Sequence, residues 1–576
     1  MHRNNLISVV FQVIIPGMID PQELKSLISG DVETSDEALT AASHDASLFE
    51  VRPQVVVDPK DVEDLKKLVT YANAHEGVNL TARSAGTDMS GGPLSESIVV
   101  SFTKYFNKIK EVREEPQGSQ KGTEISGYVV TEPGVYYRDF DKATMAAGGQ
   151  IMPSYPASRE LCTVGGIAAN NSGGEKTLTY GKTERYIRRL KMVCADGNEY
   201  EFKAMNPAEL EAKKALKTFE GEIYRKMSVL IDDNAEIIKN AKPQVSKNSC
   251  GYYLWNVRDE AADTFDLTKM IVGAQGTLGM ITEIEFGLVK PKLHSHMLVV
   301  FLPDLKLLGE TATHILEHKP ESFESYDDQT LKVAIKFLPQ LMKQMGGNLI
   351  TLGLSFMPEM LAVLESGGLP KLVLMAEFTA DTDAEALKMA TEAHDSLKGF
   401  HEKSRVTKTE ADSHKYWVIR RESFNMLRKH IHGVRTAPFI DDFVVMPKDL
   451  PVFLPKLYAL LEPYKKDLTY TIAGHVGDGN FHIIPLMDLK QEKAHKIIEE
   501  LSVKVYTLVH EFGGSITGEH NDGIIRTPFV KMQYGEAVYR LFEETKKIWD
   551  PKGIFNPGKK VGGTLEYAFK HIVRES

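Results

Sequence analysis

The chain has 576 residues, a formal net charge of −10 at pH 7, and 42% hydrophobic and 26% charged residues. This length suits about two to four packed units, and the acidic balance gives no reason to expect nucleic acid or an anionic membrane surface as a partner. The three cysteines, Cys162, Cys194 and Cys250, lie far apart. They exclude a disulfide framework and a chain-borne iron–sulfur cluster, and they suit a reducing compartment. We predict a cytoplasmic location and leave attachment to the inner face of the membrane open.

The first residues contain an apolar run but no clear membrane segment. In MHRNNLISVVFQVIIPGM a basic residue precedes the run, Gln12 interrupts it, Pro16 ends it, and no small-residue cleavage site follows. No window of the sequence reaches the ~18 consecutive apolar residues that a membrane helix needs. We predict an extra, poorly ordered N-terminus within an N-terminal extension, residues 1–49, and keep a signal or anchor as the alternative.

The first half of the chain has the pattern of an α+β domain. The segment VVVDPKDVEDLKKLVTYANAHEGVNL reads as strand, helix, strand. Asp58 is the candidate N-cap, Pro59 suits the first helical position, and apolar residues recur at helical spacing from Val62 to Ala72. Further strands are predicted at 97–102, 127–131 and 190–203, the last as a hairpin turning on Asp196-Gly197.

From about residue 294 the pattern changes to widely spaced strands between longer helices. HMLVVFL, KLVLMAEF, FVVMP and LTYTIAGH indicate the strands. The clearest helix is 492–512, which Gly513-Gly514 should end. We therefore predict a second α+β domain. The apolar stripe of that helix consists of Ala494, Ile497, Ile498, Leu501, Val505, Leu508 and Val509.

Three loops of the first half are rich in glycine and small polar residues. They are RSAGTDMSGG (83–92), TVGGIAANNSGG (163–174) and GAQGTLGMIT (273–282). Glycines let the backbone approach a ligand and point successive N–H groups at an anion. One such loop is commonly just a tight turn, but three in one domain favour a pyrophosphate ligand. The Rossmann fingerprint and the P-loop are both absent, so the sequence predicts a phosphate-containing cofactor on another scaffold.

The octapeptide HVGDGNFH (475–482) places two histidines around a turn. Asp478-Gly479 is a strong signal for a two-residue hairpin turn. With that pair at the centre, His475 and His482 lie directly opposite each other, with Cβ atoms roughly 4.5–5.5 Å apart. Two imidazoles at this distance can share one metal ion. The alternative is a pair of histidines without a ligand.

Taken together, the three loops and the terminal IFNPGK resemble the flavin-binding signatures of FAD domains of the vanillyl-alcohol oxidase type. HVGDGNFH followed by GEHNDG further resembles the branch containing FAD-linked D-lactate dehydrogenase, the glycolate oxidase flavoprotein subunit and D-2-hydroxyglutarate dehydrogenase. The resemblance covers about residues 50–560. It implies an α+β fold with a two-subdomain FAD-binding domain (50–292), a substrate or cap domain with an antiparallel sheet and a metal site (293–528), and a C-terminal helical segment (529–576) that returns to the FAD domain.

The resemblance also implies how FAD is held. The pyrophosphate would lie on the first two loops and the isoalloxazine ring would face the cap. Relatives that attach FAD covalently carry a histidine where this chain has Thr87, so we expect non-covalent FAD. Ala274-Gln275 replaces the more usual Ser-Glu, a change that the sequence does not explain. The implied cofactor-binding residues are Ser84, Gly86, Thr87, Gly91, Gly92, Thr163, Gly165, Gly166, Asn170, Ser172, Gly173, Gly276, Thr277, Gly279, Ile281 and Asn556.

In the second half, Glu519 of GEHNDG would add a carboxylate to His475 and His482. Two histidines and a carboxylate form an open site for Zn²⁺, Mn²⁺ or Fe²⁺. His520 matches the general base of the family, and imidazole is suited to accept a proton near neutral pH. The segment YWVIRRESF resembles the family's Trp-x-x-Arg segment and points to Arg420 as the carboxylate receptor, with Arg421 as the alternative. The neighbouring acids of APFIDDFVV, Asp441 and Asp442, receive no role.

We therefore predict FAD-dependent, metal-assisted oxidation of a small D-2-hydroxy acid, with D-lactate or glycolate as first candidates. The alternatives are D-2-hydroxyglutarate dehydrogenase activity, a non-catalytic flavin-binding subunit of an oxidase complex, and a metal hydrolase. The electron acceptor stays open among a quinone, an electron-transfer protein, a separate iron–sulfur subunit and O₂. A homodimer is also left open, and no nucleic-acid partner is expected.

Overall fold

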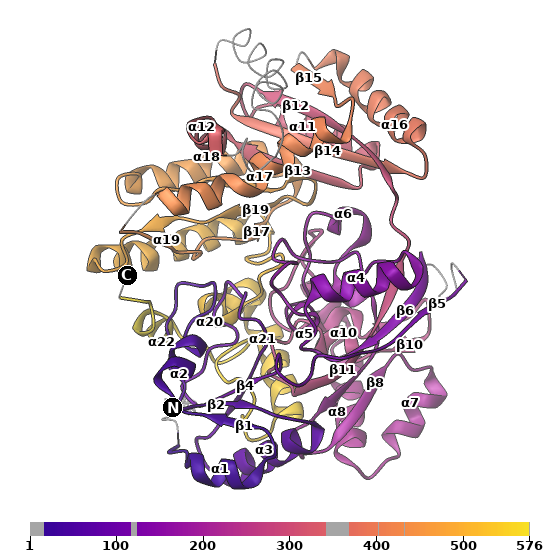
Figure 1. The fold of residues 1–576 in the computed structure, drawn as a ribbon, viewed down its shortest axis with the longest axis vertical. Helices are drawn as coiled ribbons and strands as arrows, with labels where there is room; N and C mark the ends of the chain where they lie inside the picture. Colours follow the sequence, from indigo (N-terminus) through magenta and orange to yellow (C-terminus); the bar gives the residue numbers. More distant parts are fainter. Residues whose placement is uncertain (1–16, 117–123, 341–367, 401–402, 431–432, 575–576) are drawn as a thin grey trace, which may run out of the picture.

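The computed structural model describes residues 17–116, 124–340, 368–400, 403–430 and 433–574 (Figure 1). The prediction for the start of the chain concerns residues 1–16, which lie outside this part. Residues 17–49 pack against the first domain: β1 (Asp31–Glu33) pairs with β2 (Val55–Asp58), and Phe49 forms a bridge with Ile572 near the other end of the chain.

The first sheet contains the predicted strand–helix–strand unit. β2 and β3 (Leu80–Arg83) flank β4 (Ile98–Ser101) in parallel, in the order β1-β2-β4-β3. The connecting helix α3 (Val62–Ala74) buries Leu65, Val69 and Ala72 as its spacing predicts. The predicted N-cap is wrong by one turn, because Asp61 and not Asp58 accepts a hydrogen bond from the Asp64 N–H.

A second, antiparallel sheet completes the lower body of the molecule in Figure 1. Its order is β5-β6-β11-β7-β8, and the predicted hairpin at Asp196-Gly197 joins β7 to β8. β11 follows the third glycine loop directly. The five strands are β5 (Ile109–Glu114), β6 (Ile125–Thr131), β7 (Ile187–Val193), β8 (Glu199–Lys203) and β11 (Met280–Val289).

The upper body is built on a seven-stranded antiparallel sheet (Figure 1). Its order is β15-β12-β14-β13-β18-β19-β17, so the histidine hairpin β18–β19 lies toward one edge. The predicted helix corresponds to α19 (Glu492–Glu511), and its apolar stripe is buried as expected. The strands are β12 (His294–Leu302), β13 (Ser322–Asp327), β14 (Leu372–Ala380), β15 (Lys403–Val406), β17 (Phe443–Val444), β18 (Ile472–His475) and β19 (Asn480–Ile483).

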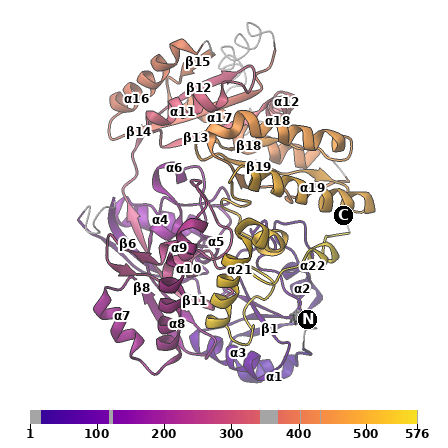
Figure 2. The ribbon, with the colours of Figure 1, turned by 180° about the vertical axis from the view of Figure 1, so that it is seen from behind.

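The C-terminal segment returns to the lower body. Helix α21 (Val530–Trp549) packs against α8 (Phe219–Asp233) and α9 (Ala235–Ala241), as Figure 2 shows, and the Trp549 ring packs on Phe202 with centroids 5.2 Å apart. Beyond it, the Leu80 N–H donates to the Ile554 carbonyl at 2.7 Å. The end of the chain therefore extends the packing of the first sheet.

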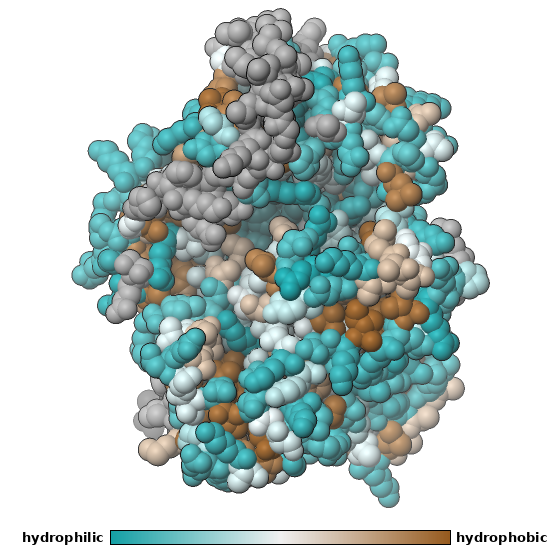
Figure 3. All heavy atoms as spheres, viewed as in Figure 1, coloured by the Kyte–Doolittle hydropathy of each residue, from teal (hydrophilic) through white to brown (hydrophobic). Residues whose placement is uncertain are grey.

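The remaining helices cover the sheets or carry site loops. Within the described ranges, no helix has both the length and the apolar character to cross a membrane. Most of the face seen in Figure 3 is hydrophilic, with apolar groups in separate patches. These helices are α1 (Pro21–Leu27), α2 (Asp36–Ala42), α4 (Tyr137–Gly148), α5 (Val164–Asn170), α6 (Thr177–Tyr180), α7 (Pro207–Lys214), α8 (Phe219–Asp233), α9 (Ala235–Ala241), α10 (Thr268–Ile271), α11 (Leu308–Glu317), α12 (Asp328–Lys336), α16 (Asp383–Ser396), α17 (Glu410–His430), α18 (Leu450–Leu461), α20 (Gly523–Arg526) and α22 (Leu565–Lys570).

Candidate functional site

One cavity of about 680 Å³ connects the glycine loops of the lower body with the histidine hairpin of the upper body. This volume lies within the range of cofactor and small-molecule pockets. Both sets of residues predicted from the sequence therefore meet at one place. The predicted residues that line the cavity are Ser84, Gly86, Thr87, Gly92, Thr163, Gly165, Gly166, Asn170, Ser172, Gly173, Gly276, Gly279, Ile281, Arg420, His475, His482, Glu519 and His520.

The glycine loops present backbone to the cavity. Gly86 has φ +70° and Gly276 has φ +67°, a region that other residues rarely adopt. Thr163 caps α5 by accepting the Gly166 N–H at 3.3 Å. A Cβ at Gly166 would have no heavy atom closer than 3.6 Å. The wall of the cavity therefore consists of turns and open backbone, which suits a large anionic ligand.

Three of the predicted cofactor-binding residues are not in the cavity wall. Gly91 packs against Phe49 and Ile524. Thr277 is fully buried, and its hydroxyl bonds to Tyr252 and to the Ala274 carbonyl. The third is Asn556, which is fully buried.

Asn556 ties two of the loops together from behind. Its Nδ2 donates to the Gly92 carbonyl at 3.0 Å and to the Gln275 carbonyl at 2.7 Å, and it is fully buried. The return of the C-terminal segment thus fixes the first loop relative to the third.

Gln275 shows why an amide stands where the resemblance led us to expect a glutamate. Its Oε1 accepts the Gly523 N–H at 2.9 Å, and its Nε2 donates to Ser90 Oγ at 3.2 Å and to Asn170 Oδ1 at 3.4 Å. The amide supplies both a donor and an acceptor at this position, whereas an ionised glutamate would supply acceptors alone. Gln275 therefore joins all three glycine loops to the last residue of GEHNDG.

The hairpin differs in register from the prediction. Val476–Asp478 form a 3-10 turn and only Gly479, with φ +67°, is left-handed, so the turn has four residues. His475 consequently pairs with Asn480, and His482 pairs with Ala473. The predicted direct opposition is wrong. The two rings still lie on one face of the sheet, with centroids 5.3 Å apart.

The GEHNDG loop brings Glu519 and His520 to the hairpin. His475 Nε2 lies 3.3 Å from Glu519 Oε1, and the rings of His482 and His520 stack at 5.0 Å. Single donor atoms of Asp442, His482, Glu519 and His520 all lie within 4.8 Å of one another. The structure therefore gathers every residue predicted for the metal site and the base, with His475 in contact through Glu519.

Asp441 and Asp442, for which no role was predicted, hold this arrangement. Asp441 lies against the Nδ1 atoms of His482, at 3.2 Å, and of His520, at 2.5 Å. Asp442 accepts the backbone N–H groups of Glu519 and His520, at 2.9 and 2.7 Å. One acid thus contacts the rings and the other contacts the loop.

Two more buried residues complete the cluster. Glu324 Oε1 lies 2.5 Å from His475 Nδ1. Lys247, with no exposed side-chain surface, donates to Glu519 Oε1 at 2.5 Å and pairs with Asp478 at 3.2 Å. Buried charges of this kind need partners, but the sequence around each residue gives no sign of the contact.

The charges of the cluster shift the pKa values of its side chains. Burial opposes protonation of His475, but Glu324 raises its pKa to about 9. Burial acts in the same way on His520, whose pKa Asp441 and Asp442 raise to about 9. Burial also opposes ionisation of Glu519, yet Lys247 and then His475 hold its pKa well below the usual range. Buried carboxylates thus raise the pKa values of the two histidines, whereas neighbouring cations lower the pKa of Glu519.

The two candidate arginines have different surroundings. Arg420 Nη2 lies 3.3 Å from Glu324, and its Nε is buried without a hydrogen-bond acceptor among the described residues. Arg421 is 40% exposed in its side chain, stacks over Trp417 and donates to both oxygens of Glu175 at 2.6–2.7 Å. Arg420 therefore belongs to the histidine cluster, whereas Arg421 bridges the two bodies at the cavity.

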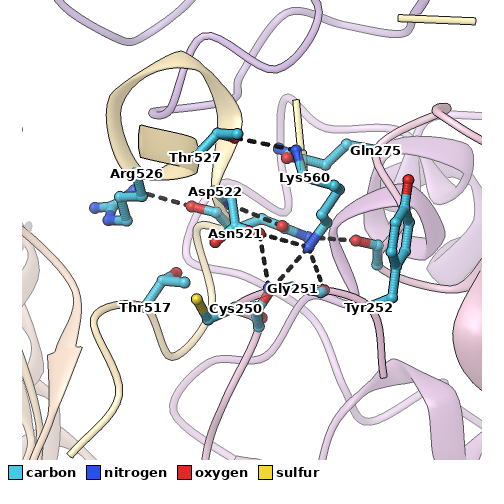
Figure 4. Close-up of polar contacts among 12 residues, drawn as sticks. Cys250, Gly251, Tyr252, Gln275, Thr517, Asn521, Asp522, Arg526, Thr527 and Lys560 are labelled. Atoms are coloured by element: carbon cyan, nitrogen blue, oxygen red, sulfur yellow. Dashed lines mark hydrogen bonds and ion pairs between the residues drawn. The ribbon is translucent and has the colours of Figure 1, made fainter. Parts of the chain in front are cut away.

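A buried ion pair holds the GEHNDG loop against the lower body (Figure 4). Lys560 Nζ donates to Asp522 at 3.0 Å and to the Gly251 carbonyl at 2.8 Å. Arg526, which is also fully buried, donates to the carbonyls of Asn521 and Asp441 at 3.0 and 2.8 Å. The segment after Glu519 is thus fastened to the lower body, to the C-terminal segment and to the acid pair.

Comparison with known protein families gives two matches. Residues 53–203 match the FAD binding domain, and residues 292–560 match the C-terminal domain of FAD linked oxidases. The first match contains the first two glycine loops. The second match contains all the histidines and carboxylates of the cluster, whereas Lys247 lies outside both matches.

Three relatives align over nearly the whole chain. A D-2-hydroxyglutarate dehydrogenase of Pseudomonas putida is 26% identical over 95% of this chain, but the chain spans only 52% of that longer protein. The glycolate oxidase subunit GlcD of Bacillus subtilis is 23% identical, with 94% and 96% of the two chains covered. A D-lactate dehydrogenase of Anaerostipes hadrus is 25% identical, with 95% and 98% covered.

A solved structure has the same fold. The 4-ethylphenol oxidase of Gulosibacter chungangensis superposes with a TM-score of 0.65 at 14% identity, covering 95% of this chain and 97% of that one. The predicted fold class, an α+β FAD-binding domain of the vanillyl-alcohol oxidase type with an antiparallel α+β cap and a returning C-terminal segment, is confirmed.

Proposed function

We propose that this chain, which matches the FAD binding domain and the C-terminal domain of FAD linked oxidases, is an FAD-dependent enzyme that oxidises a small D-2-hydroxy acid to the 2-oxo acid. D-lactate and glycolate are the first candidates and D-2-hydroxyglutarate is the alternative, the three acids in the names of the aligned relatives. One observation carries the proposal: a single cavity joins the glycine loops to the cluster of Arg420, His475, His482, Glu519 and His520.

The residues present fit FAD. The wall formed by the three loops is backbone and small side chains, and Gly86 and Gly276 take left-handed conformations there. N–H groups in such turns suit a pyrophosphate. When bound, FAD supplies the acceptor for the hydride that leaves Cα of the substrate.

The donor set also fits a divalent cation. His475, His482 and Glu519 would hold it, and Zn²⁺, Mn²⁺ and Fe²⁺ all accept such nitrogen and oxygen ligands. Asp442 is left out of this set because its oxygens already accept backbone N–H groups. The cation would supply a Lewis acid at the substrate hydroxyl.

The chain's own side chains supply the remaining steps. Arg420 receives the substrate carboxylate, and a guanidinium can bind it through two parallel hydrogen bonds. Neutral His520, whose share rises as the pH approaches its pKa of about 9, takes the hydroxyl proton as Cα–H leaves, so a C=O bond replaces the two bonds to hydrogen.

The proposal also covers the electron acceptor and the oligomeric assembly. The name of the Bacillus subtilis relative describes a subunit, which supports a separate subunit as the electron acceptor. An iron–sulfur subunit, a quinone, an electron-transfer protein and O₂ are the candidate acceptors. A homodimer is compatible with any of these acceptors. The three buried cysteines support a cytoplasmic location.

An anaerobic assay tests the proposal. Purified protein loaded with FAD is mixed with D-lactate, glycolate or D-2-hydroxyglutarate, and with the L-isomers of the two chiral acids, while flavin absorbance is followed. We expect one or more D-acids to bleach the flavin. Acid precipitation should then release the flavin into the supernatant, because Thr87 offers no attachment. Flavin that no acid reduces would favour the alternative of a non-catalytic flavin-binding subunit.

A further inference from the structure

Asp441 is a fully buried carboxylate that faces two imidazoles. Oδ1 lies 3.2 Å from His482 Nδ1, and Oδ2 lies 2.5 Å from His520 Nδ1. The two rings are stacked, with an interplanar angle of 26°. Each oxygen of one side chain thus serves a different ring.

The contact with Asp441 decides what each ring can do. Each carboxylate oxygen lies at hydrogen-bond distance from the Nδ1 atom of one ring. An ionised carboxylate only accepts hydrogen bonds, so Nδ1 carries the hydrogen in both rings. In the neutral imidazole the lone pair then lies on Nε2. Both rings line the cavity.

The surroundings keep Asp441 in this position. Arg526 donates to the Asp441 carbonyl at 2.8 Å (Figure 4 shows Arg526 and the loop it holds). Asp442 next to it accepts bonds from Thr517 Oγ1 at 2.6 Å and from the backbone of Glu519 and His520. The loop is therefore fixed without Asp441, whose own side chain is left to the imidazoles.

We infer that Asp441 is a positioning residue that sets the tautomers of His482 and His520 together, so that one ring offers Nε2 to a cation and the other offers Nε2 to a substrate proton. The inference rests on the proposed function, in which His482 is a ligand and His520 is the base. It goes beyond that function, because it makes cation binding and proton abstraction depend on the same carboxylate.

Asp441→Asn and Asp441→Ala test this. In Asp441→Asn the amide accepts at one oxygen and donates at its nitrogen, so one ring must accept at Nδ1 and carry its hydrogen on Nε2. That ring can act neither as ligand nor as base. Asp441→Ala removes the carboxylate but imposes no wrong tautomer. We therefore expect Asp441→Asn to be the more damaged variant, although it preserves the shape of the side chain.

The first measurement is zinc affinity, by competition with a fluorescent chelator. Removing a carboxylate behind a metal-binding histidine typically costs about 10–100-fold in metal affinity or activity. We expect a loss of this size in zinc affinity, in the rate of flavin reduction by the acid, or in both, with the order wild type, then Asp441→Ala, then Asp441→Asn. A purely structural role predicts the reverse order of the two variants, because alanine leaves a buried cavity.

Asp64→Asn is the matched control. Asp64 is also buried, but it accepts only the backbone N–H groups of Ser29, Gly30 and Lys60, far from any imidazole of the site. The zinc affinity and the rate of flavin reduction of Asp64→Asn should equal those of the wild type. Wild-type values of both quantities in Asp441→Asn would overturn the inference, as would an alanine variant that is worse than the asparagine variant. If no acid bleaches the wild-type flavin, the proposed function fails, and the order of zinc affinities still decides the inference.

Discussion

The two ends of the cavity are built in different ways. At the flavin-loop end, backbone groups of three loops form the wall, and each loop is one continuous stretch of sequence. At the histidine end, side chains from β13, β18, β19, α17 and the loops at 247, 441 and 519 meet in one charged cluster. Backbone-built walls are encoded locally, whereas a side-chain cluster is encoded only by the fold that assembles it.

This difference in construction predicts that flavin binding and flavin reduction depend on different residues. Changes to the histidines and Glu519 should leave the flavin in place and alter its reduction, since their hydrogen bonds go to Glu324, Asp441, Asp442 and Lys247 and not to the glycine loops. Changes behind the loops should do the opposite. Each of the following experiments can therefore break or sharpen the comparison between the two ends.

The largest effect is expected from removing the cation. Prolonged chelation, or His482→Ala, should abolish flavin reduction by substrate while FAD stays bound, because two remaining protein ligands rarely hold an ion against a chelator. Elemental analysis and stopped-flow bleaching of the flavin measure the two halves of this statement. His510→Ala, on the exposed end of α19, is the control. Full-speed reduction by metal-free protein would make the hairpin histidines direct substrate contacts instead.

His520→Ala should have the next largest effect. Removing a positioned base typically slows a reaction by roughly 10²–10⁴-fold, so flavin reduction should slow by that range while metal content and flavin content remain. The test is stopped-flow reduction together with elemental analysis of the same sample. Loss of the metal along with the rate would make His520 a ligand, as its place among the clustered donor atoms allows.

The same contrast explains what the sequence could predict. Sequence reasoning predicted the glycine loops, the apolar stripe of α19 and the strands, because hydrophobic periodicity and turn-forming residues are local signals. The hairpin register failed because a two-residue turn needs two left-handed residues, and only Gly479 adopts that conformation. His475 was found, but its partner Glu324 lies 151 residues away, and Lys247 lies 272 residues from Glu519. Lone charged residues usually lie at the surface, so no local pattern distinguishes these two.

Arg420→Lys should have a smaller effect than the loss of the base. Lysine keeps the charge but loses the two-pronged hydrogen bond, which costs about 1.5–3 kcal/mol for a charged pair, or roughly 10–150-fold in kcat/KM for the acid. Steady-state kinetics with an artificial electron acceptor measure this, with flavin content as the check on folding. Arg421→Lys is the comparison variant, because Arg421 is already paired with Glu175. A larger loss in that variant would move the carboxylate receptor to Arg421.

The smallest effect is expected at the other end of the cavity, from Gln275→Glu. This side chain joins all three glycine loops, so it tests whether a wall made of backbone depends on side chains behind it. Glutamate keeps the acceptor for the Gly523 N–H but loses the donor to Ser90 and Asn170, and it adds a buried charge near Asp88. An unsatisfied buried group costs about 1–3 kcal/mol. We therefore expect a lower temperature of flavin release, followed by flavin fluorescence, with an almost unchanged rate of flavin reduction in the protein that keeps FAD. Gln244→Glu, at an exposed position, should not change the release temperature. A large fall in the reduction rate of Gln275→Glu, with flavin release unchanged, would show that the two ends are not separable, because the Gln275 contact to Gly523 would then be acting through the GEHNDG loop on His520.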